Sequence, residues 1–590
     1  MQLNLPCSLP LLPEVLTIAQ DRTTSREASP RMLLEASLIG VIGGLSAQLF
    51  MLLLRFFNHI FLYDIAGYRP PGLEGGRLFQ TIGPHGLWLI PVATTLGGLI
   101  SGFIVYRWAP EAEGHGTDTV VYSFHRKEGV IRPRVSPIKM IASAVTIGSG
   151  GSAGREGPIA LIAAGAASVY SQLLHHSERD RRLLVLAGMA AGLSAIFRSP
   201  MGTAVFAIEV LYSRLDFETD ALLYTMLSSI VAYTINGLFV GFRPLFRTPT
   251  IPTPSASTFP WYVVFGLAAG AVATILPEVF YKTRDLFRAI PIPIYFKPAL
   301  GGLCVGLLGV ALPQVLGGGY GWIQLSIDGK LALRLLAVLI LAKLLAFALT
   351  VSSGGSGGVF APSLFVGAAL GGTFAALLHK DPATFVVVGM AAVFGGAARV
   401  PIATMLMVTE MTQGYHLLLP AGITVMISYL LQAKIGSTLN LKYRSLYEGQ
   451  VPNYRDSPAH YRAEIQTALN LLGSRNVPAA EKVHRLDLLR LLRSRIRFDL
   501  PGHRVLTLGI VKEGTPLVGK PLGTLYERLA QCDFEVVAVM RREHVVLPHP
   551  DTIIEPGDRV VVITSPEARA ELGQLIEPLP EVGPREPHPP

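Results

Sequence analysis

The chain is poor in charged residues and in cysteine, and both features limit the classes of protein to which it can belong. Asp, Glu, Lys and Arg make up 15% of its 590 residues, whereas a soluble domain carries about a quarter. Half of the residues are hydrophobic and the mean hydropathy is +0.45, which indicates a membrane protein. The three cysteines, Cys7, Cys304 and Cys532, are isolated, so neither a disulfide framework nor a metal site is expected.

The sequence also lacks the common motifs of soluble enzymes. The sequence contains no Walker A loop, zinc-ligand spacing or nucleophile elbow, so we expect no enzyme activity, no metal and no cofactor. The net charge of +9 includes short arginine clusters, such as residues 179–182, without the interleaved aromatic residues of a nucleic-acid surface. That cluster flanks apolar segments, so a lipid bilayer rather than nucleic acid is the expected partner.

Apolar runs recur between residues 33 and 450 and define a membrane body. Many of these runs are shorter than the roughly 18 residues that a simple membrane span needs, and glycine or proline interrupts them. Short, broken and tilted helices are therefore expected rather than a bundle of straight spans. The clearest runs are Leu38–Leu54, Leu87–Val105, Val263–Leu276, Leu331–Val351 and Leu417–Leu431.

The rest of the chain divides into two tails, a linker and a small domain. Residues 1–32 are mostly polar and lack the pattern of a cleaved signal peptide, so we predict an N-terminal tail. Residues 451–502 form a polar linker, with a helical patch near residues 486–492. Residues 503–575 hold short β-branched runs separated by turn residues, which predict a small α+β domain. Residues 576–590 are rich in proline, and we predict that they are disordered.

The membrane body contains an internal repeat, over about residues 33–240 and 259–435. Five matches occur in the same order, at offsets of 201 to 204 residues. Transporter folds of this kind place their binding site where the two halves meet, near the middle of the membrane. The matched segments are Gly114–Gly116 with Gly317–Gly319, Pro158 with Pro362, Ala187–Ala191 with Val388–Ala392, Arg198–Pro200 with Arg399–Pro401, and Glu209 with Glu410.

Glu156 lies inside a glycine-rich break, residues 148–158, between long apolar segments. A carboxylate inside a membrane is costly and tends to mark an ion or proton pathway. The glycines around it let backbone N–H groups approach an anion closely. Pro158 suits the first turn of a helix, whose N-terminus carries partial positive charge. These features together predict an anion site with an acidic gate.

The order of four motifs resembles the CLC family of chloride channels and chloride/proton antiporters, over roughly residues 33–450. Gly154–Pro158 is similar to the family's GREGP motif, and Gly358–Pro362 is similar to its GxFxP motif. Pro110–Gly116 occupies the place of its GSGxP loop, and Ser445–Tyr447 resembles the segment that supplies its pore-lining tyrosine. The resemblance implies a mainly α membrane protein with an inverted repeat of broken, tilted helices. It also implies a homodimer with one anion pathway in each subunit.

The resemblance assigns roles to individual residues. Glu156 would be the gating carboxylate, which competes with chloride for one site and swings away when it is protonated. Tyr447 would donate its hydroxyl to the central ion, with nearby Tyr443 as the alternative. Backbone N–H groups would replace the hydration shell of the ion. The implied anion-binding set is His115, Gly116, Gly154, Arg155, Gly157, Gly358, Val359, Phe360, Ala361 and Tyr447.

His115 is the first departure from the family's pattern, which usually has serine there. A neutral imidazole still donates one N–H, and a protonated one binds anions more strongly. Asp118 is close enough in sequence to pair with His115. In the alternative, His115 faces away from the ion and Gly116 supplies only its backbone N–H. The choice of anion therefore stays open.

Val210 is the second departure. Antiporters of the family often carry two glutamates in a row, and the second relays protons, whereas this chain has only Glu209. We therefore predict an uncoupled, channel-like chloride pathway gated by protonation of Glu156, with a chloride/proton or fluoride/proton antiporter as the alternative. Glu209 also has a structural interpretation, because it and Glu410 have the same spacing from an arginine. The pairs Arg198 with Glu209 and Arg399 with Glu410 would then be ion pairs or caps.

Residues 503–575 resemble the C-terminal RCK (TrkA-C) type regulatory domain, with a Pro-Gly-Asp turn at residues 556–558 before a β-branched run. The resemblance implies a small ligand at this domain. No GxGxxG fingerprint is present, so full dinucleotide binding is not expected. We interpret His544 and His549 as surface or packing residues. Such modules are cytosolic, so we expect a multi-pass protein of the cell (inner) membrane with both termini in the cytoplasm.

Overall fold

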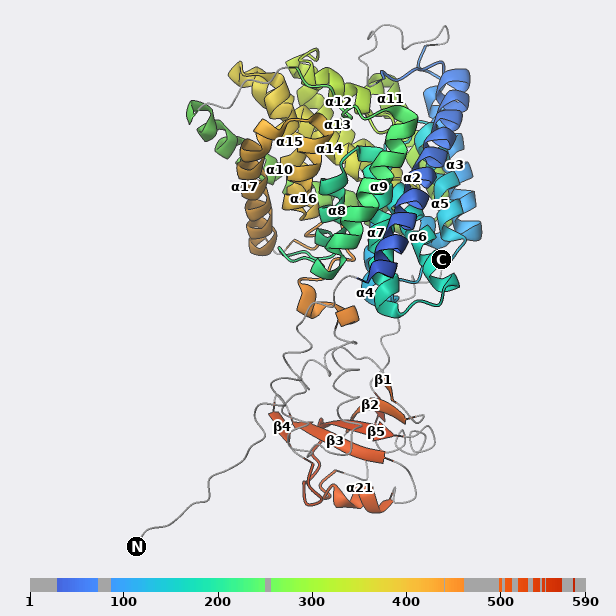
Figure 1. Cartoon of the computed structure of the whole chain (residues 1–590), viewed down its shortest axis with the longest axis vertical. Coiled ribbons are helices and arrows are strands. Elements are labelled where there is room, and N and C mark those ends of the chain that lie inside the picture. Colours follow the sequence, from blue (N-terminus) through green and yellow to red (C-terminus); the bar gives the residue numbers. More distant parts are fainter. Residues whose placement is uncertain are drawn as a thin grey trace. The chain divides into compact units, whose positions relative to one another are not determined.

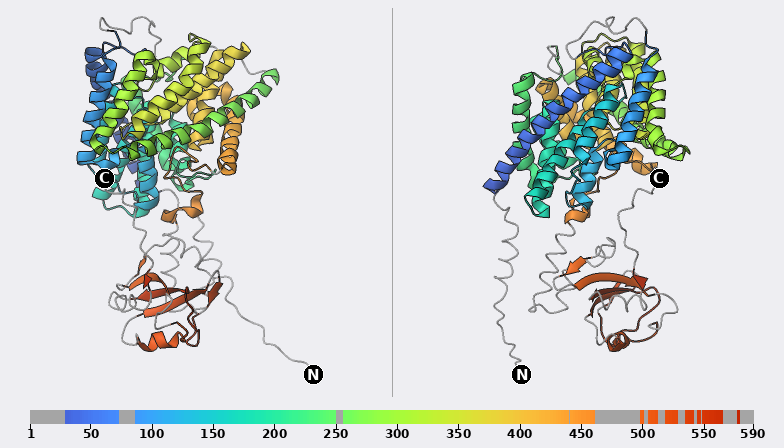
Figure 2. Two further views of the ribbon diagram at one scale, coloured as in Figure 1. Left: turned by 180° about the vertical axis from the view of Figure 1, so that it is seen from behind. Right: turned by 90° about the vertical axis from the view of Figure 1, so that its right-hand side faces the viewer.

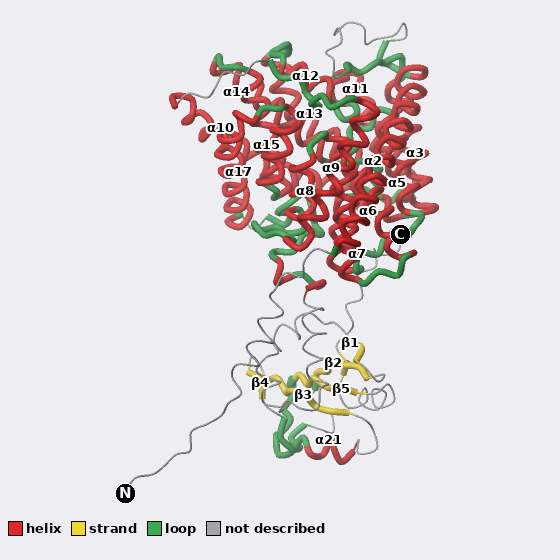
Figure 3. The backbone as a smooth tube through the Cα atoms, viewed as in Figure 1, coloured by secondary structure: helices red, strands yellow, loops and turns green. Residues whose placement is uncertain are grey.

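The computed structural model describes residues 29–72, 86–249, 256–439, 441–460, 498–500, 504–511, 518–528, 534–541, 544–546, 548–564 and 577–578. Most of the predicted tails and most of the predicted linker, including its helical patch, lie outside these residues. The chain separates into two compact units, residues 1–454 and 455–590. The described part of the first unit is built from helices, and all the named strands belong to the second (Figure 3).

The helices of the first unit form two matched series (Figure 1). The first series is α2 (Pro30–Asn58), α3 (Ile90–Trp108), α4 (Thr117–Arg126), α5 (Val135–Gly148), α6 (Glu156–Leu173), α7 (Glu178–Phe197), α8 (Pro200–Glu209) and α9 (Leu222–Val240). The second series is α10 (Phe259–Ala289), α11 (Lys297–Ala311), α12 (Tyr320–Ile327), α13 (Leu333–Ser352), α14 (Phe360–Leu378), α15 (Pro382–Ala398), α16 (Pro401–Thr412) and α17 (Leu418–Thr438). Short 3-10 segments and one π-helix, η1, extend or connect these helices: η1 (His59–Ile65), η2 (Pro110–Ala112), η3 (Thr219–Ala221), η4 (Ala256–Thr258), η5 (Ile294–Phe296), η6 (Pro313–Val315), η7 (Tyr415–Leu417) and η8 (Tyr454–Asp456).

The two series share unusual backbone angles at equivalent positions. Gly150 and Gly354 both have a φ of 101°, a value that L side chains rarely adopt. Arg198 and Arg399 end α7 and α15 in the left-handed region, with φ of 56° and 60°. Such agreement extends the sequence repeat to the detail of single turns, and it supports the predicted repeat.

Helix lengths vary widely, as the interrupted apolar runs predict. Eight of the described helices are long and apolar enough to cross a membrane. Between them lie four short helices: α4 and α8 have 10 residues each, α12 has 8 and α16 has 12. The long helices are tilted against one another, and α2 runs obliquely across the body (Figure 2). The predicted architecture of short, broken and tilted helices is confirmed.

The centre of the body is formed by helices that are apolar on every side. Every residue of α15 after Pro382 is buried, and so is every residue of α7 from Arg182 to Phe197. A helix without a polar face belongs in a core or a membrane. Small residues let these helices approach closely, since a Cβ on Gly43 of α2 would lie 2.6 Å from the Cβ of Ala191 in α7.

The second unit contains one antiparallel sheet with the strand order β1-β2-β5-β3-β4, and β6 pairs with β2. Its core holds Val536, Val539 and Val560, with Leu522 and Leu525 from the helical side. β1 belongs to this sheet because its backbone pairs with β2. The domain therefore begins before residue 503, where the sequence predicted its start. The elements are β1 (Phe498–Leu500), β2 (Arg504–Ile510), α21 (Gly523–Arg528), β3 (Phe534–Arg541), β4 (His544–Val546), β5 (Arg559–Thr564) and β6 (Glu577–Pro578).

Candidate anion site

The two glycine-rich loops of the repeats pair directly with each other. The N–H of Gly154 donates to the carbonyl of Gly358, and the N–H of Gly358 donates to the carbonyl of Gly154, both at 2.7 Å. This antiparallel bridge joins equivalent positions of the two halves. It therefore brings the first turns of α6 and α14 together, where the repeat predicted that the halves meet.

Glu156 is the first residue of α6, and its side chain is fully buried at this junction. A Cβ added to Gly154 would lie 2.2 Å from Glu156 Oε2 and 3.0 Å from the backbone nitrogen of Ala361. The carboxylate faces the N–H groups of Arg155, Glu156 and Ala361. Neither of its oxygens makes a hydrogen bond of normal length and angle. A negatively charged group thus lies between two helix N-termini, which favour an anion.

Arg155 places a positive charge next to this carboxylate. Its Nε lies 3.8 Å from Glu156 Oε1, too far for a hydrogen bond. The guanidinium stacks over the ring of Tyr320 at 4.4 Å from the centroid, and one nitrogen donates to the sulfur of Met51 at 3.3 Å. Because other groups hold the guanidinium, it can attract an anion without closing on the carboxylate.

His115 and Tyr447 meet on another side of the α6 start. Their ring centroids lie 5.4 Å apart, and the Tyr447 hydroxyl lies beside Thr117. The carbonyl of His115 packs on Gly157, since a Cβ there would lie 1.9 Å from it. The structure therefore brings together the sequence-predicted residues from three separate motifs.

Asp118 does not pair with His115, so that prediction is wrong. The Asp118 carboxylate accepts the backbone N–H of Gly449 at 2.7 Å. His115 Nδ1 is buried without a hydrogen-bond partner among the residues that the structure describes. Asp118 instead ties the start of α4 to the loop that carries Tyr447.

Helix α10 also holds the loop that carries Tyr447. The hydroxyl of Tyr281 donates to the carbonyl of Leu446 at 2.7 Å. The hydroxyl of Tyr443 donates to Asp285 at 2.6 Å, and its ring stacks on Tyr281. Tyr443 is thus engaged with α10, which favours Tyr447 as the hydroxyl that faces the ion.

Two buried lysines fix the loops around the site, and the sequence analysis missed them. Lys139 Nζ donates to the carbonyl of Ala112 at 3.0 Å and to that of Gly114 at 2.6 Å. Lys343 Nζ donates in the same way to Val315 at 2.8 Å and to Gly317 at 2.6 Å. The two lysines are repeat mates, at the same offset as Pro158 and Pro362. That shared offset is the signal that could have revealed them.

Glu209 and Glu410 cap each other's half of the repeat. Glu209, at the end of α8, accepts the N–H groups of Ile402 and Ala403 at the start of α16, at 3.2 and 2.7 Å. Glu410 in α16 accepts the N–H of Gly202 in α8 at 2.9 Å. The structural interpretation of these glutamates as caps is thus supported.

The predicted ion pairs of these glutamates do not form. Arg198 donates to the carbonyl of Arg243 at 2.9 Å, and Arg399 donates to the carbonyl of Ser213 at 3.2 Å. The equal spacing between arginine and glutamate in the two halves therefore does not indicate an ion pair. The arginines end α7 and α15, and the glutamates cap the starts of α16 and α8.

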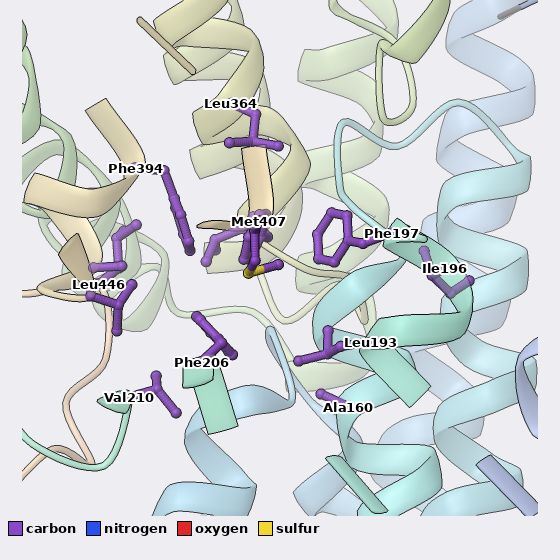
Figure 4. Close-up of a cluster of buried hydrophobic side chains, with 14 of the residues drawn as sticks. Ala160, Leu193, Ile196, Phe197, Phe206, Val210, Leu364, Phe394, Met407 and Leu446 are labelled. Atoms are coloured by element: carbon purple, nitrogen blue, oxygen red, sulfur yellow. The ribbon is translucent and has the colours of Figure 1, made fainter. Parts of the chain in front are cut away.

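Val210 is fully buried at the end of α8 and belongs to a hydrophobic cluster with Phe206 and Leu446 (Figure 4). The side chain of Phe360 also packs in this cluster, 3.8 Å from Phe394 between ring centroids. The cluster places apolar groups where a second glutamate would stand.

Two opposed, matched halves that meet at a buried carboxylate define a membrane transport protein of the inverted-repeat class. The chain belongs to the voltage gated chloride channel (CLC) family, whose model matches residues 97–433. The model of the TrkA-C domain matches residues 510–577, within the second unit.

Relatives and solved structures agree with this membership. The chain is 30% identical over 422 residues to the H(+)/Cl(-) exchange transporter ClcA of Salmonella gallinarum (strain 287/91 / NCTC 13346), covering 69% of this chain and 86% of that protein. It is also 30% identical over 357 residues to a putative chloride channel protein, ClcB-like, of Ralstonia nicotianae (strain ATCC BAA-1114 / GMI1000), covering 58% and 82%.

The fold matches a slow cyanobacterial Cl-/H+ antiporter with a TM-score of 0.62 and 21% identity, over 71% of this chain and 97% of that chain. It matches a CLC-type fluoride/proton antiporter with a TM-score of 0.60 and 23% identity, over 71% and 98%. The protein is therefore a multi-pass membrane protein and a CLC-family chloride transporter, and nothing in the comparisons indicates an enzyme.

Proposed function

We propose that the protein exchanges chloride for protons, with Glu156 as the residue that both ions use. The observation that carries this proposal is the place of the Glu156 carboxylate, buried between the first turns of α6 and α14. The relatives named as H(+)/Cl(-) exchange transporters support exchange over the uncoupled, channel-like pathway. The channel-like interpretation rested on Val210 alone.

The mechanism follows from competition for one position. The partial positive charge of two helix N-termini and the charge of Arg155 attract one negative group. An ionised Glu156 fills that position and keeps chloride out. A protonated Glu156 is neutral and loses this attraction, so chloride takes its place. The protonated carboxylate carries its proton away from the site while chloride enters the site. Proton and chloride therefore move in opposite directions.

The tyrosine hydroxyl and the backbone amides allow the ion to leave again. Neutral dipoles replace the hydration of chloride without holding it as tightly as a fixed charge would. Tyr447, Thr117 and His115 offer such dipoles beside Gly157. Anion selectivity then depends on the imidazole of His115, where the family usually has a hydroxyl.

The test is transport by the purified protein in lipid vesicles. With valinomycin clamping the voltage, chloride efflux should be accompanied by proton uptake. The reversal potential should shift when a pH gradient is imposed at fixed chloride gradient. A reversal potential that stays at the chloride equilibrium value under every pH gradient would show an uncoupled pathway and reject exchange.

The variant Glu156→Gln tests the gate itself. It removes the charge that competes with chloride, so chloride flux should persist and become independent of pH, while proton movement should be lost. Glu128→Gln is the matched control, because Glu128 is a partly exposed carboxylate near Arg181, 3.8 Å away. Proton-coupled chloride flux that is equal in Glu156→Gln and in the wild type would contradict the assignment.

A further inference from the structure

The exchange proposed above requires a proton path to Glu156 from each face of the membrane body. On one face the chain leaves the body through residues 448–454, and we call this the exit face. Val210 cannot carry a proton, and the oxygens of Glu209 accept two N–H groups of α16. Neither position that the family resemblance indicates therefore offers a free carboxylate.

Glu113 is a carboxylate in the loop between η2 and α4 that the transport mechanism does not use. Its side chain is exposed, so it exchanges protons with the solution. Tyr106 of α3 lies beside it. The other charged groups that face it are Lys139 of α5 and Arg284 and Arg288 of α10.

Glu113 lies toward the exit face. The guanidinium of Arg284, which faces Glu113, makes two hydrogen bonds with Glu448, at 2.6 and 2.8 Å. The neighbouring Gly449 donates to Asp118 at the start of α4. The chain segment that leaves the body is therefore tied to the surroundings of Glu113.

The loop of Glu113 is also fixed to the anion site. The carbonyls on either side of Glu113 both accept Lys139 Nζ. The same carbonyl of Gly114 accepts the N–H of Gly357 at 3.1 Å, next to the Gly154 bridge. A solvent-exposed carboxylate is thus held on a rigid loop that touches both halves of the repeat.

His115 is the next titratable group along this loop. It lies two residues from Glu113, at most about 7 Å between Cα atoms. The residue is 7% exposed, and the Nδ1 of its imidazole has no partner in the described part of the chain. Its carbonyl contacts Gly157, the neighbour of Glu156. Lys139 and Arg284 face the ring and Tyr447 packs beside it.

We propose that Glu113 takes up the proton at the exit face and passes it through His115 to Glu156. A proton moves from the Glu113 carboxyl oxygen to a free imidazole nitrogen, and a proton moves from the imidazole to the Glu156 carboxylate; no electron is transferred. Lys139 and Arg284 repel a lasting second positive charge, so the imidazolium is short-lived. The two departures from the family's pattern compensate each other in this arrangement, because His115 and the Glu113 carboxylate replace the relay that Val210 lacks.

The variant Glu113→Gln tests this inference in the full-length protein in vesicles, with proton and chloride fluxes measured together. The proton flux per chloride should fall by about tenfold or more, since a positioned acid–base group contributes at least this much. Chloride flux should stay close to that of the wild type and so shows that the variant is folded. Glu113→Asp retains a carboxylate and should keep most of the coupling.

Glu111→Gln is the matched control, because Glu111 lies two residues away and pairs with Arg132 on the outside of the loop. It should leave the flux ratio unchanged. Equal coupling in Glu113→Gln and in the wild type would overturn the role of Glu113 and leave the exchange function intact. A wild-type protein that moves chloride without protons would overturn the exchange function and this inference together.

Discussion

We assign three different tasks to glutamate residues of the body, namely gate, cap and relay, and burial alone does not separate them. Glu156 and Glu209 are both buried. The oxygens of Glu209 accept two backbone N–H groups, whereas those of Glu156 have no well-formed hydrogen bond. Glu113 is exposed. The state of the carboxylate oxygens therefore distinguishes a cap from a gate.

Sequence spacing could not make this distinction. Glu209 and Glu410 follow their prolines at equal distances, which predicts equal roles but not the partner of either carboxylate. The groups that they bind lie in the other half of the repeat, about 200 residues away. Only the folded chain shows that each caps the opposite helix.

The contribution of the Glu209 cap to the free energy of unfolding can be measured. In the variant Glu209→Ala, the N–H groups of Ile402 and Ala403 lose their acceptor inside the body. The free energy of unfolding should fall by about 1–3 kcal/mol, and Glu209→Gln should cost less because one carbonyl oxygen remains. Thermal unfolding in detergent measures the order wild type, Gln, Ala. Loss of proton coupling in Glu209→Gln at unchanged stability would instead make Glu209 a relay.

Gly154 offers a second test at the scale of one residue. A Cβ there would lie 2.2 Å from Glu156 Oε2, so Gly154→Ala should displace the carboxylate from the anion position. Chloride flux at alkaline pH should then rise relative to flux at acidic pH, as measured in vesicles. Gly436→Ala in α17 is the control, because its Cβ would meet nothing within 4 Å. An unchanged pH profile in Gly154→Ala would place the carboxylate elsewhere.

At the scale of elements, the sequence predicted the broken helices but not how they hold the site. Interrupted apolar runs and repeat matches locate α6, α14 and the short α8 and α16. The contacts of α10 with the Tyr447 loop have no local signal, since Tyr281 and Leu446 are 165 residues apart. A contact between a helix and a loop that is distant in sequence cannot be predicted from either segment alone.

The hydrogen bond from Tyr281 can be removed with little change in volume. Tyr281→Phe leaves the carbonyl of Leu446 without its donor, which loosens the loop and lowers the occupancy of the ion beside Tyr447. We expect a several-fold weaker chloride affinity, of the size that about 1 kcal/mol gives, measured by titration calorimetry. Tyr295→Phe, at a more exposed position away from this loop, should bind chloride as the wild type does.

The second unit has its own supporting contact. Arg541 of β3 makes two hydrogen bonds to Asp558, at 3.0 and 2.9 Å, and Asp558 is 1% exposed. This contact raises the pKa of Arg541 further above its ordinary value. The contact stabilises the Pro-Gly-Asp turn at residues 556–558. The sequence motif predicted this turn but not that an arginine of β3 would bind it.

At the scale of the whole molecule, we propose a homodimer in the inner membrane, with both termini and the TrkA-C unit in the cytoplasm and a small ligand at that unit. We therefore expect a protein mass in detergent of twice 63.4 kDa by light scattering. Each subunit contains a complete set of site residues, so a dimer with one Glu156→Gln subunit should keep coupled transport in the other. A monodisperse, active monomer would contradict the dimer.

The paired glycine loops also limit how the molecule can move. Two backbone hydrogen bonds of 2.7 Å join the halves at the anion position, and reciprocal glutamate caps join them again at α8 and α16. Rocking one half against the other would break these buried bonds during every cycle, at several kcal/mol each in a medium without water. We therefore expect the halves to move as one rigid body, with access to the ion changing through the movement of single side chains.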